Sequence, residues 1–294
     1  MSLSYYRLRH GVAGASGISL TGLAFSITCK EPSQYANEFA KAGLLLAKKV
    51  PGDNSNMALC QLYGGIVSAY WSDLATSREI LEKGIYYSKQ LYDPSCYGYC
   101  LQSLIIIQAF HGMEIPSMLQ YIKVQKESLD AKLRSGRTDV TVILSAIYDS
   151  HYALVEDQPI WLNSAITEKV VNDSPGFYRF AYHLYHMISK YIMGDPDCIK
   201  LEPKVEKLLA FSPGVVMCYE YYFYSSLIRL RAAILQKHRN QVKLYLDSNI
   251  EKFRKVASLS APFAFRLKIL EAERRLLDKP RSFTPTPPQK ILVL

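Results

Sequence analysis

The sequence predicts an all-α fold, arranged as a superhelical array of antiparallel helix hairpins of the tetratricopeptide-like solenoid type. Three observations lead to this prediction. Apolar residues recur with helical periodicity along nearly all of the 294 residues, and strand-like alternation between turn signals is absent. The helix expected over 215–236 is apolar on two sides, so it needs neighbours on both. A weak internal repeat of about forty residues is typical of stacked hairpins.

The helix expected over 215–236 gives the clearest of these signals. At about 100° per residue, its apolar side chains form two nearly opposite faces. One face holds Tyr219, Phe223, Leu227, Leu230 and Ile234, and the other holds Tyr221, Tyr224, Ile228 and Leu235. An inner helix of a hairpin array buries both sides in this way, because each repeat packs against one neighbour on either side.

Turn residues divide the chain into thirteen expected helices. Breaks fall at clusters of proline, glycine, serine and aspartate, as in the segments 31–33, 93–95 and 212–214. Several breaks place Ser or Asp at the N-cap and proline near the first turn. The helices are expected over residues 14–30, 33–49, 56–71, 74–91, 95–112, 115–134, 138–155, 159–171, 176–193, 202–210, 215–236, 239–258 and 262–278.

The internal repeat is centred on two glycines. Residues 39–50 align with residues 80–91, which pairs Gly43 with Gly84, 41 positions apart (84 − 43 = 41). A glycine inside a helix costs about 1 kcal/mol relative to alanine, so these positions indicate close approach of a neighbouring helix. The period suits a long tetratricopeptide-like or HEAT-like hairpin, although the tetratricopeptide consensus itself is not met.

These features predict one helical-repeat domain over residues 13–280, with a subdivision near 172–176. A lead-in at 1–12 precedes it, and a proline-rich tail or linker at 281–294 follows it. The apolar segment 11–29 approaches the length of a transmembrane helix, but its Gly, Ser and Thr content favours a tightly packed helix. We therefore expect no membrane span.

Composition favours a globular chain, with 49% hydrophobic and 21% charged residues. The net charge of +9 is concentrated in residues 200–294, where there are 18 Lys and Arg and 8 Asp and Glu. Because acids are interspersed with these bases, solvated helix surfaces are favoured over a nucleic-acid or membrane surface. The six cysteines show no framework spacing and no secretory signal precedes them, so we expect reduced thiols and a cytoplasmic protein.

Motifs for chemistry are weak throughout. The glycines of segment 11–17 lack the strand and the lysine of a phosphate-binding loop. Cys96 and Cys100 share a helix face, as do His183 and His186, but neither pair has the further partners of a tetrahedral metal site. Buried thiols and aromatic packing are the favoured interpretations. No kinase, ATPase or hydrolase signature occurs, so we expect no enzyme, no cofactor and no metal.

The candidate interaction or packing residues lie in the helix over 215–236 and at the turn after it. Tyrosines supply amphipathic rings suited to protein contacts. The basic residues span the end of this helix, the turn after it and the start of the next helix, and the dipole favours cations near a helix C-terminus. The candidates are Tyr221, Tyr222, Tyr224, Arg229, Arg231, Lys237 and Arg239.

Two segments carry a resemblance to a known family. They are the run Tyr-Tyr-Phe-Tyr-Ser-Ser-Leu at 221–227 and, about forty residues later, the Pro-containing helix at 261–273 that ends Glu-Ala-Glu. Together with the upstream glycines at 17, 43 and 64–65 and with Trp71, they resemble the tetratricopeptide-like helical region of large multidomain sensor kinases. Those proteins combine a Ser/Thr-kinase-like domain, an AAA-type predicted ATPase, helical repeats, a GAF domain and a histidine kinase.

The resemblance spans roughly residues 10–280 and covers none of the family's catalytic modules, so no catalytic or nucleotide-binding residue carries over. It implies a non-catalytic scaffold or regulatory region in signal transduction. The implied partner is a kinase or ATPase module in cis or in trans, or a peptide in the concave groove. Two alternatives remain: a basic helical-repeat protein that binds nucleic acid, and an all-α enzyme built around His183, His186 and Tyr222.

Overall fold

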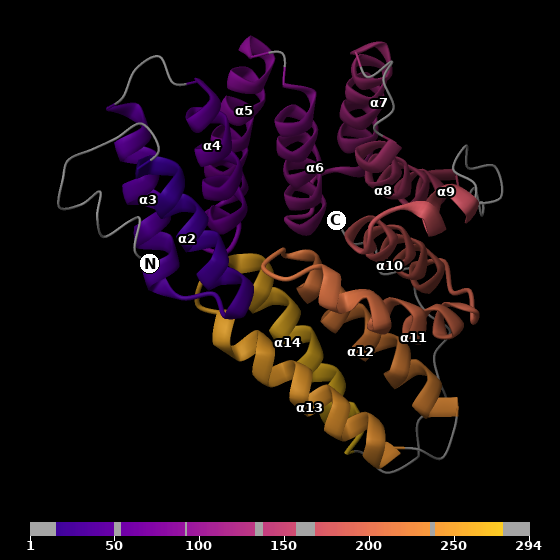
Figure 1. Cartoon of the computed structure of the whole chain (residues 1–294). Helices are drawn as coiled ribbons and strands as arrows, with labels where there is room; N and C mark the ends of the chain where they lie inside the picture. The colour runs from indigo at the N-terminus through magenta and orange to yellow at the C-terminus, as the bar shows by residue number, and fades with distance from the viewer. Residues whose placement is uncertain are drawn as a thin grey trace. The chain divides into compact units, whose positions relative to one another are not determined.

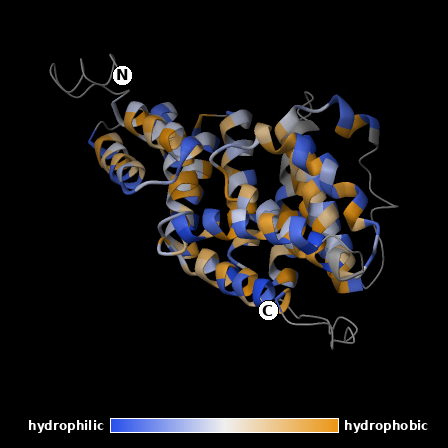
Figure 2. Ribbon diagram, turned by 90° about the horizontal axis from the view of Figure 1, so that it is seen from below, coloured by the Kyte–Doolittle hydropathy of each residue, from blue (hydrophilic) through white to orange (hydrophobic). Residues whose placement is uncertain are grey.

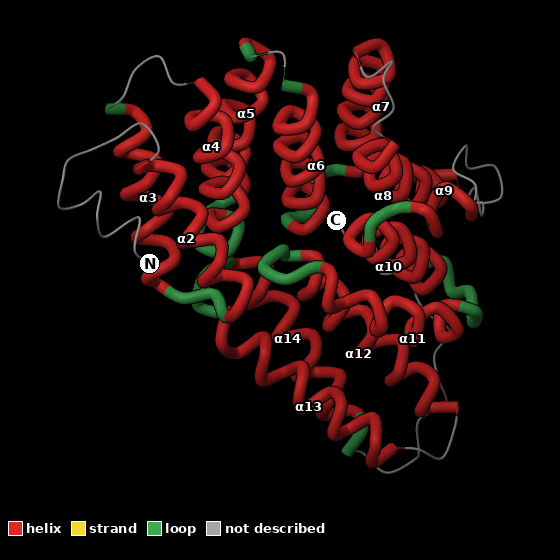
Figure 3. The backbone as a smooth tube through the Cα atoms, viewed as in Figure 1, coloured by secondary structure: helices red, strands yellow, loops and turns green. Residues whose placement is uncertain are grey.

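The computed structural model contains only helices and their connections in the part of the chain that it describes (Figures 1 and 3). The predicted all-α class is therefore confirmed. The described residues are 16–49, 54–91, 93–132, 138–156, 168–235 and 239–278. The lead-in predicted at 1–12 and the tail predicted at 281–294 lie outside them.

The observed helix ends lie close to the predicted ones, because turn residues and apolar spacing are local signals. The α-helices are α2 Ser16–Lys30, α3 Gln34–Lys48, α4 Asn54–Ser68, α5 Leu74–Gln90, α6 Pro94–Phe110, α7 Ile115–Lys132, α8 Thr138–Glu156, α9 Glu168–Asp173, α10 Gly176–Ile192, α11 Cys198–Leu208, α12 Met217–Leu235, α13 Arg239–Val256 and α14 Ala261–Leu276, and a 3-10 turn, η2, covers Leu209–Phe211.

Two predicted helices differ most in their bounds. The helix expected over 159–171 is described only from residue 168, as α9, because residues 157–167 lie outside the described part of the chain.

The second difference is at α11. The helix was expected to begin at residue 202, immediately before Pro203, but it begins at Cys198 and contains Pro203 as its sixth residue. Proline lacks the N–H that a helix interior normally uses. Pro203 is exposed, so the disturbed turn faces solvent and the helix continues through it.

Contacts divide the chain into two compact units. Unit 1 comprises residues 1–111, 124–140 and 213–216, and unit 2 comprises residues 112–123, 141–212 and 217–294. Residues 172–176, near which a subdivision was predicted, lie inside unit 2.

None of the described helices combines the length and the apolar character required to cross a bilayer. In Figure 2, hydrophilic and hydrophobic residues are interspersed along the helices.

Unit 1 contains two layers of helices. In one layer, α2 packs against α4 and α4 packs against α6. In the other layer, α3 packs against α2 and α4, and α5 packs against α4 and α6. Each helix therefore contacts the next helix and, within the first layer, the next but one. Figure 1 shows α4 and α5 running side by side in this unit.

Buried positions in the second layer recur at a spacing of 41 residues. The buried set of α3 is Ala36, Ala40, Gly43 and Ala47, and each has a buried counterpart in α5 at Ser77, Leu81, Gly84 and Ser88 (77 − 36 = 41, and likewise for the others). The two helices therefore use the same register to pack on the first layer.

Gly43 and Gly84 lie where a neighbouring helix approaches closely, as predicted. A Cβ atom on Gly43 would lie 2.7 Å from the carbonyl oxygen of Gly17 in α2. A Cβ atom on Gly84 would lie 2.7 Å from the Sγ atom of Cys100 in α6. Since real Cβ atoms do not approach other atoms this closely, glycine permits the observed spacing.

Unit 2 repeats the same packing order. α10 packs against α12 and α12 against α14, while α11 contacts α10 and α12, and α13 contacts α12 and α14. The short helix α9 and the η2 turn contact α10. Phe180, Tyr221, Phe253 and Phe263 are among the largest side chains that are completely buried.

The prediction that α12 is buried on two sides is confirmed. The ring of Tyr219 packs edge-on against Phe253 of α13 and Phe263 of α14, with centroid distances of 5.4 and 4.9 Å. On another side, Tyr224 packs edge-on against Tyr191 of α10 at 6.0 Å. α12 is therefore an inner helix of unit 2, held between helices that precede it and helices that follow it.

Candidate interaction site

The three candidate tyrosines of α12 pack against neighbouring helices. Tyr221 is only 1% exposed, and its hydroxyl donates to Oε1 of Glu202 at 2.9 Å. Tyr222 is half-buried, with Nζ of Lys252 located 4.0 Å from its ring centroid. Tyr224 is half-buried against α10. None of these rings is a freely exposed anchor, so the structure gives all three a packing role.

Arg229 connects α12 to the two helices beside it. Its Nε and Nη2 atoms donate to Oε1 of Glu202 in α11 at 3.1 and 2.8 Å, and Nη2 also donates to Oε2 of Glu206 at 3.0 Å. The guanidinium stacks on the ring of Tyr245 in α13, 3.8 Å from its centroid. Glu202 is 4% exposed, and these contacts compensate the burial of its charge.

The other basic candidates do not form one continuous surface with Arg229. Arg231 donates through Nη2 to the carbonyl oxygen of Gly194 at 3.1 Å, which fixes the turn after α10. Gly194 has φ 81°, a left-handed conformation suited to glycine. Arg239 is the half-buried first residue of α13. Lys237 lies outside the described residues.

A buried ion pair between Glu220 and Arg266 was not recognised in the sequence. Glu220 of α12 is 6% exposed, and Oε1 accepts a hydrogen bond from Nη2 of Arg266 in α14. Burial raises the pKa of Glu220, while the charge and hydrogen bond of Arg266 act in the opposite direction. The available signal was a charged residue inside an apolar run in each helix, but the sequence does not show which two charges meet.

The two motif pairs considered for metal binding lie inside the helical packing. The ring of Tyr182 packs edge-on against His183 and His186, with centroid distances of 5.3 and 6.2 Å. Cys96 and Cys100 are buried free thiols of α6. Within the described ranges, no group of three or more His, Cys, Asp or Glu is arranged to hold a metal ion.

His183 is buried without a hydrogen-bond partner for either ring nitrogen among the described residues, and it is 5% exposed. Burial, assisted by the positive charge of Lys204 and by His186 and Arg179, lowers the pKa of His183 to about 4. An unfolded histidine titrates near pH 6.5. The unfolded state therefore binds more protons, so stability is complete above about pH 6.5 and is lost as the pH falls towards about 4.

We expect His183 to contribute about 1–2 kcal/mol to the loss of stability between about pH 7.5 and about pH 5. The variant His183→Leu should lose less stability than the wild-type chain over this interval, as measured by urea unfolding at both pH values. Met187→Leu is the matched control, because Met187 is a buried, non-titrating residue of the same helix. An identical loss in wild type and His183→Leu would contradict this assignment.

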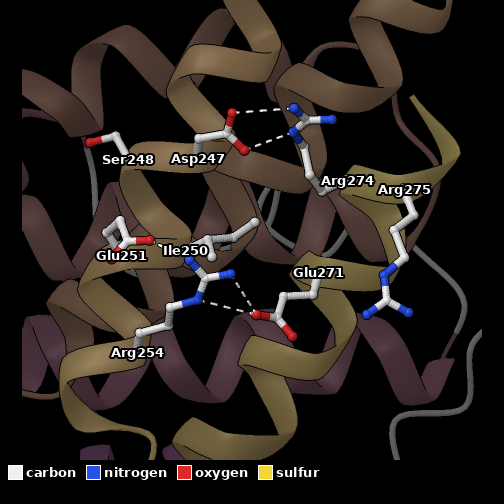
Figure 4. Close-up of a pocket in the computed structure, with 8 residues that line it drawn as sticks. All are labelled: Asp247, Ser248, Ile250, Glu251, Arg254, Glu271, Arg274 and Arg275. Atoms are coloured by element: carbon white, nitrogen blue, oxygen red, sulfur yellow. Dashed lines mark hydrogen bonds and ion pairs between the residues drawn. The ribbon is translucent and has the colours of Figure 1, made fainter. Parts of the chain in front are cut away.

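A groove lined mostly by charged residues lies between α13 and α14 (Figure 4). Its volume is about 450 Å³. Arg274 pairs with Asp247 at 2.7 Å, and Arg254 pairs with Glu271 at 2.9 Å, so both ion pairs cross from one helix to the other. The groove is lined by Asp247, Ser248, Ile250, Glu251, Arg254, Glu271, Arg274 and Arg275.

No protein-family model, curated protein or solved structure was found to match the chain. The likeness to sensor-kinase helical regions therefore depends on the sequence motifs described above, chiefly on the segments 221–227 and 261–273. In the structure these segments belong to α12 and α14, which pack against each other. Tyr219, immediately before the first segment, contacts Phe263 of the second. Both segments therefore have a packing role here.

Proposed function

We propose that this chain is a non-catalytic helical-repeat scaffold in signal transduction. It forms a tetratricopeptide-like array that couples an ATPase-like module to a sensor histidine kinase, or that binds a partner protein in trans. Arrays of this kind expose extended surfaces for protein binding, because each repeat buries only its neighbours. Protein is the expected partner class, in preference to nucleic acid, and the cytoplasm is the expected compartment.

The observation that carries the proposal is the packing order of the helices. In both units, alternate helices form one layer and the helices between them form the second layer. The recurrence of buried positions at 41 residues between α3 and α5 supports a repeating hairpin. A stacked hairpin array has both properties.

The pairing of the buried charges also supports a structural role. Glu202, Arg229, Glu220 and Arg266 join α11, α12 and α14 through ion pairs. Ion-pair networks with a structural role are a common setting for buried charges, and these carboxylates are engaged by arginines of neighbouring helices. Their arrangement favours fixed helix packing.

The first test is to read the coding sequence on both sides of this chain. Kinase-like and ATPase-like sequence upstream, with GAF or histidine-kinase sequence downstream, would establish coupling in cis. If the flanking coding sequences are unrelated to these modules, the partner is expected to be a separate protein.

Photo-crosslinking in cells then tests whether the chain binds protein at all. A photoreactive residue would replace Leu45, Tyr86 or Phe265, which are exposed apolar residues of α3, α5 and α14. We expect a discrete heavier species from at least one position and none from the exposed polar control Glu79. Absence of a crosslinked protein from all three positions would contradict a scaffold role.

A further inference from the structure

We propose that the outer face of α14, together with the α13–α14 groove, binds an acidic amphipathic helix of a partner protein. This inference rests on the proposed scaffold function and deepens it, because it names the binding face and the chemistry of the partner. It is argued from the exposed side chains of α14, from the pairing of charges in the groove and from their spacing.

The outward side of α14 carries an apolar row next to a basic row. At about 100° per residue, Phe265, Ala272 and Leu276 fall together on the side opposite the buried Phe263 and Leu270. Phe265 is 62% exposed and Leu276 is 45% exposed. Phe265 and Leu276, with Ala272 between them, form an apolar row that the apolar stripe of a partner helix can cover.

The basic row consists of Lys268 and Arg275, which lie between the apolar row and the groove. Both side chains are exposed. Arg275 lines the groove, and Figure 4 shows its guanidinium apart from the ion pairs of Arg254 and Arg274. Neither Lys268 nor Arg275 has an ion-pair partner among the described residues.

Each acid of the groove lining already has an ion-pair partner. Asp247 pairs with Arg274, and Glu251 and Glu271 both pair with Arg254. Because Arg254 serves two carboxylates, the three acids of the lining and the four cations Arg254, Arg274, Arg275 and Lys268 leave one net positive charge on this face. Lys268 and Arg275 are the two cations that no described carboxylate pairs with. Carboxylates of a partner complement them, and such rim charges steer association and set the orientation of the complex.

The spacing of the features matches a helix lying along α14. Lys268 and Arg275 are seven residues apart, which is two turns or about 10.5 Å. A partner helix with glutamates seven residues apart places both carboxylates at the same spacing. Phe265 and Leu276 are eleven residues apart, about 16 Å along the axis, so an apolar stripe of about three to four turns covers both.

Nucleic acid fits this surface less well than an acidic helix does. Asp247, Glu251 and Glu271 line the same groove as the arginines, and their carboxylates repel a continuous phosphate backbone. Nucleic-acid surfaces usually present a stripe of cations that neutralises several phosphates. Here the two remaining cations adjoin an exposed phenylalanine and leucine, which an amphipathic helix covers.

The test uses the full chain and a fluorescently labelled probe peptide of about 20 residues, long enough to span the face at about 1.5 Å per residue. The probe is an amphipathic helix with leucines on one face and glutamates seven residues apart beside them. A matched peptide replaces those glutamates by glutamine. We expect saturable binding of the glutamate peptide in fluorescence anisotropy and binding at least about fivefold weaker for the glutamine peptide.

Variants of the chain locate the binding face. The double variant Lys268→Glu with Arg275→Glu should lower the affinity for the glutamate peptide by at least about tenfold, because two attractions become repulsions. Phe265→Ser should weaken binding about tenfold through loss of the apolar anchor. Lys207→Glu, an exposed charge reversal on α11, should leave the affinity unchanged. Thermal unfolding should show all of these exposed-site variants folded.

Three results would overturn the inference: no saturable binding at about 1 mM peptide, equal affinity for the two peptides, or an unchanged affinity in the Lys268 and Arg275 double variant. A single-stranded oligonucleotide that binds through these cations while the peptide does not would assign the face to nucleic acid instead. The crosslinking experiment tests the scaffold function separately from the α14 face. A partner captured at Leu45 or Tyr86 would support the scaffold function even if the peptide does not bind to α14.

Discussion

Replacing Arg266 by leucine is expected to destabilise the chain by about 3–5 kcal/mol at neutral pH, because it leaves the Glu220 carboxylate buried without its cation. Glu220 is only 6% exposed. Arg266 also donates through Nη1 to the carbonyl oxygen of Pro262 at 3.3 Å, and its guanidinium lies 5.7 Å from the ring centroid of Phe223. Urea unfolding of wild type and variant measures the effect.

The pH dependence of the Arg266→Leu variant identifies the cause. Burial already raises the pKa of Glu220 in the presence of Arg266, and loss of the cation raises it further. The folded variant therefore binds a proton more readily than its unfolded state. The penalty is complete above the folded pKa and disappears as the pH falls to the unfolded value of about 4.3, so the difference from wild type should shrink on acidification.

A double variant and a surface control complete this experiment. Glu220→Gln combined with Arg266→Leu should recover at least half of the lost stability, because no buried charge remains. Arg275→Leu on the exposed side of α14 should change stability by no more than about 0.5 kcal/mol. The buried carboxylate is not responsible if the double variant is no more stable than Arg266→Leu and if Arg266→Leu loses the same stability at neutral and at acidic pH.

This ion pair illustrates what the sequence could and could not predict. The helices were predictable because their signals are local: apolar spacing sets the helix and a proline or glycine cluster ends it. Glu220 and Arg266 are separated by 46 positions, and no local rule selects one arginine over another. Their pairing depends on how α12 and α14 cross, which is a tertiary property.

The candidate tyrosines show a second limit. The pattern correctly placed Tyr221 and Tyr224 on an apolar face of α12, but a face does not reveal how deeply each side chain is covered. Tyr221 is buried and donates to Glu202, which lies 19 positions earlier. The groove between α13 and α14 was missed for the same reason. Its lining comes from two helices whose polar sides were read separately as solvated surfaces.

Gly43→Ala is expected to destabilise the chain by about 1–3 kcal/mol, even though alanine favours the helix more than glycine by about 1 kcal/mol. The new Cβ atom would lie 2.7 Å from the carbonyl oxygen of Gly17 and 2.9 Å from the backbone nitrogen of Thr21. Backbone atoms cannot rotate away as a side-chain end can, so α2 and α3 must separate. Thermal or urea unfolding measures the cost.

Gly22→Ala provides a matched control in the helix that α3 contacts. A Cβ atom on Gly22 would have no other atom within 4 Å, so the same substitution should stabilise the chain by up to about 1 kcal/mol through helix propensity. Opposite signs for the two variants follow only if Gly43 is required for close packing. The change in stability caused by Gly84→Ala should lie between those of Gly43→Ala and Gly22→Ala. The atom nearest to the new Cβ there is the Sγ of Cys100, which belongs to a side chain and can move. Stabilisation by Gly43→Ala would show that α2 and α3 do not pack in the observed register.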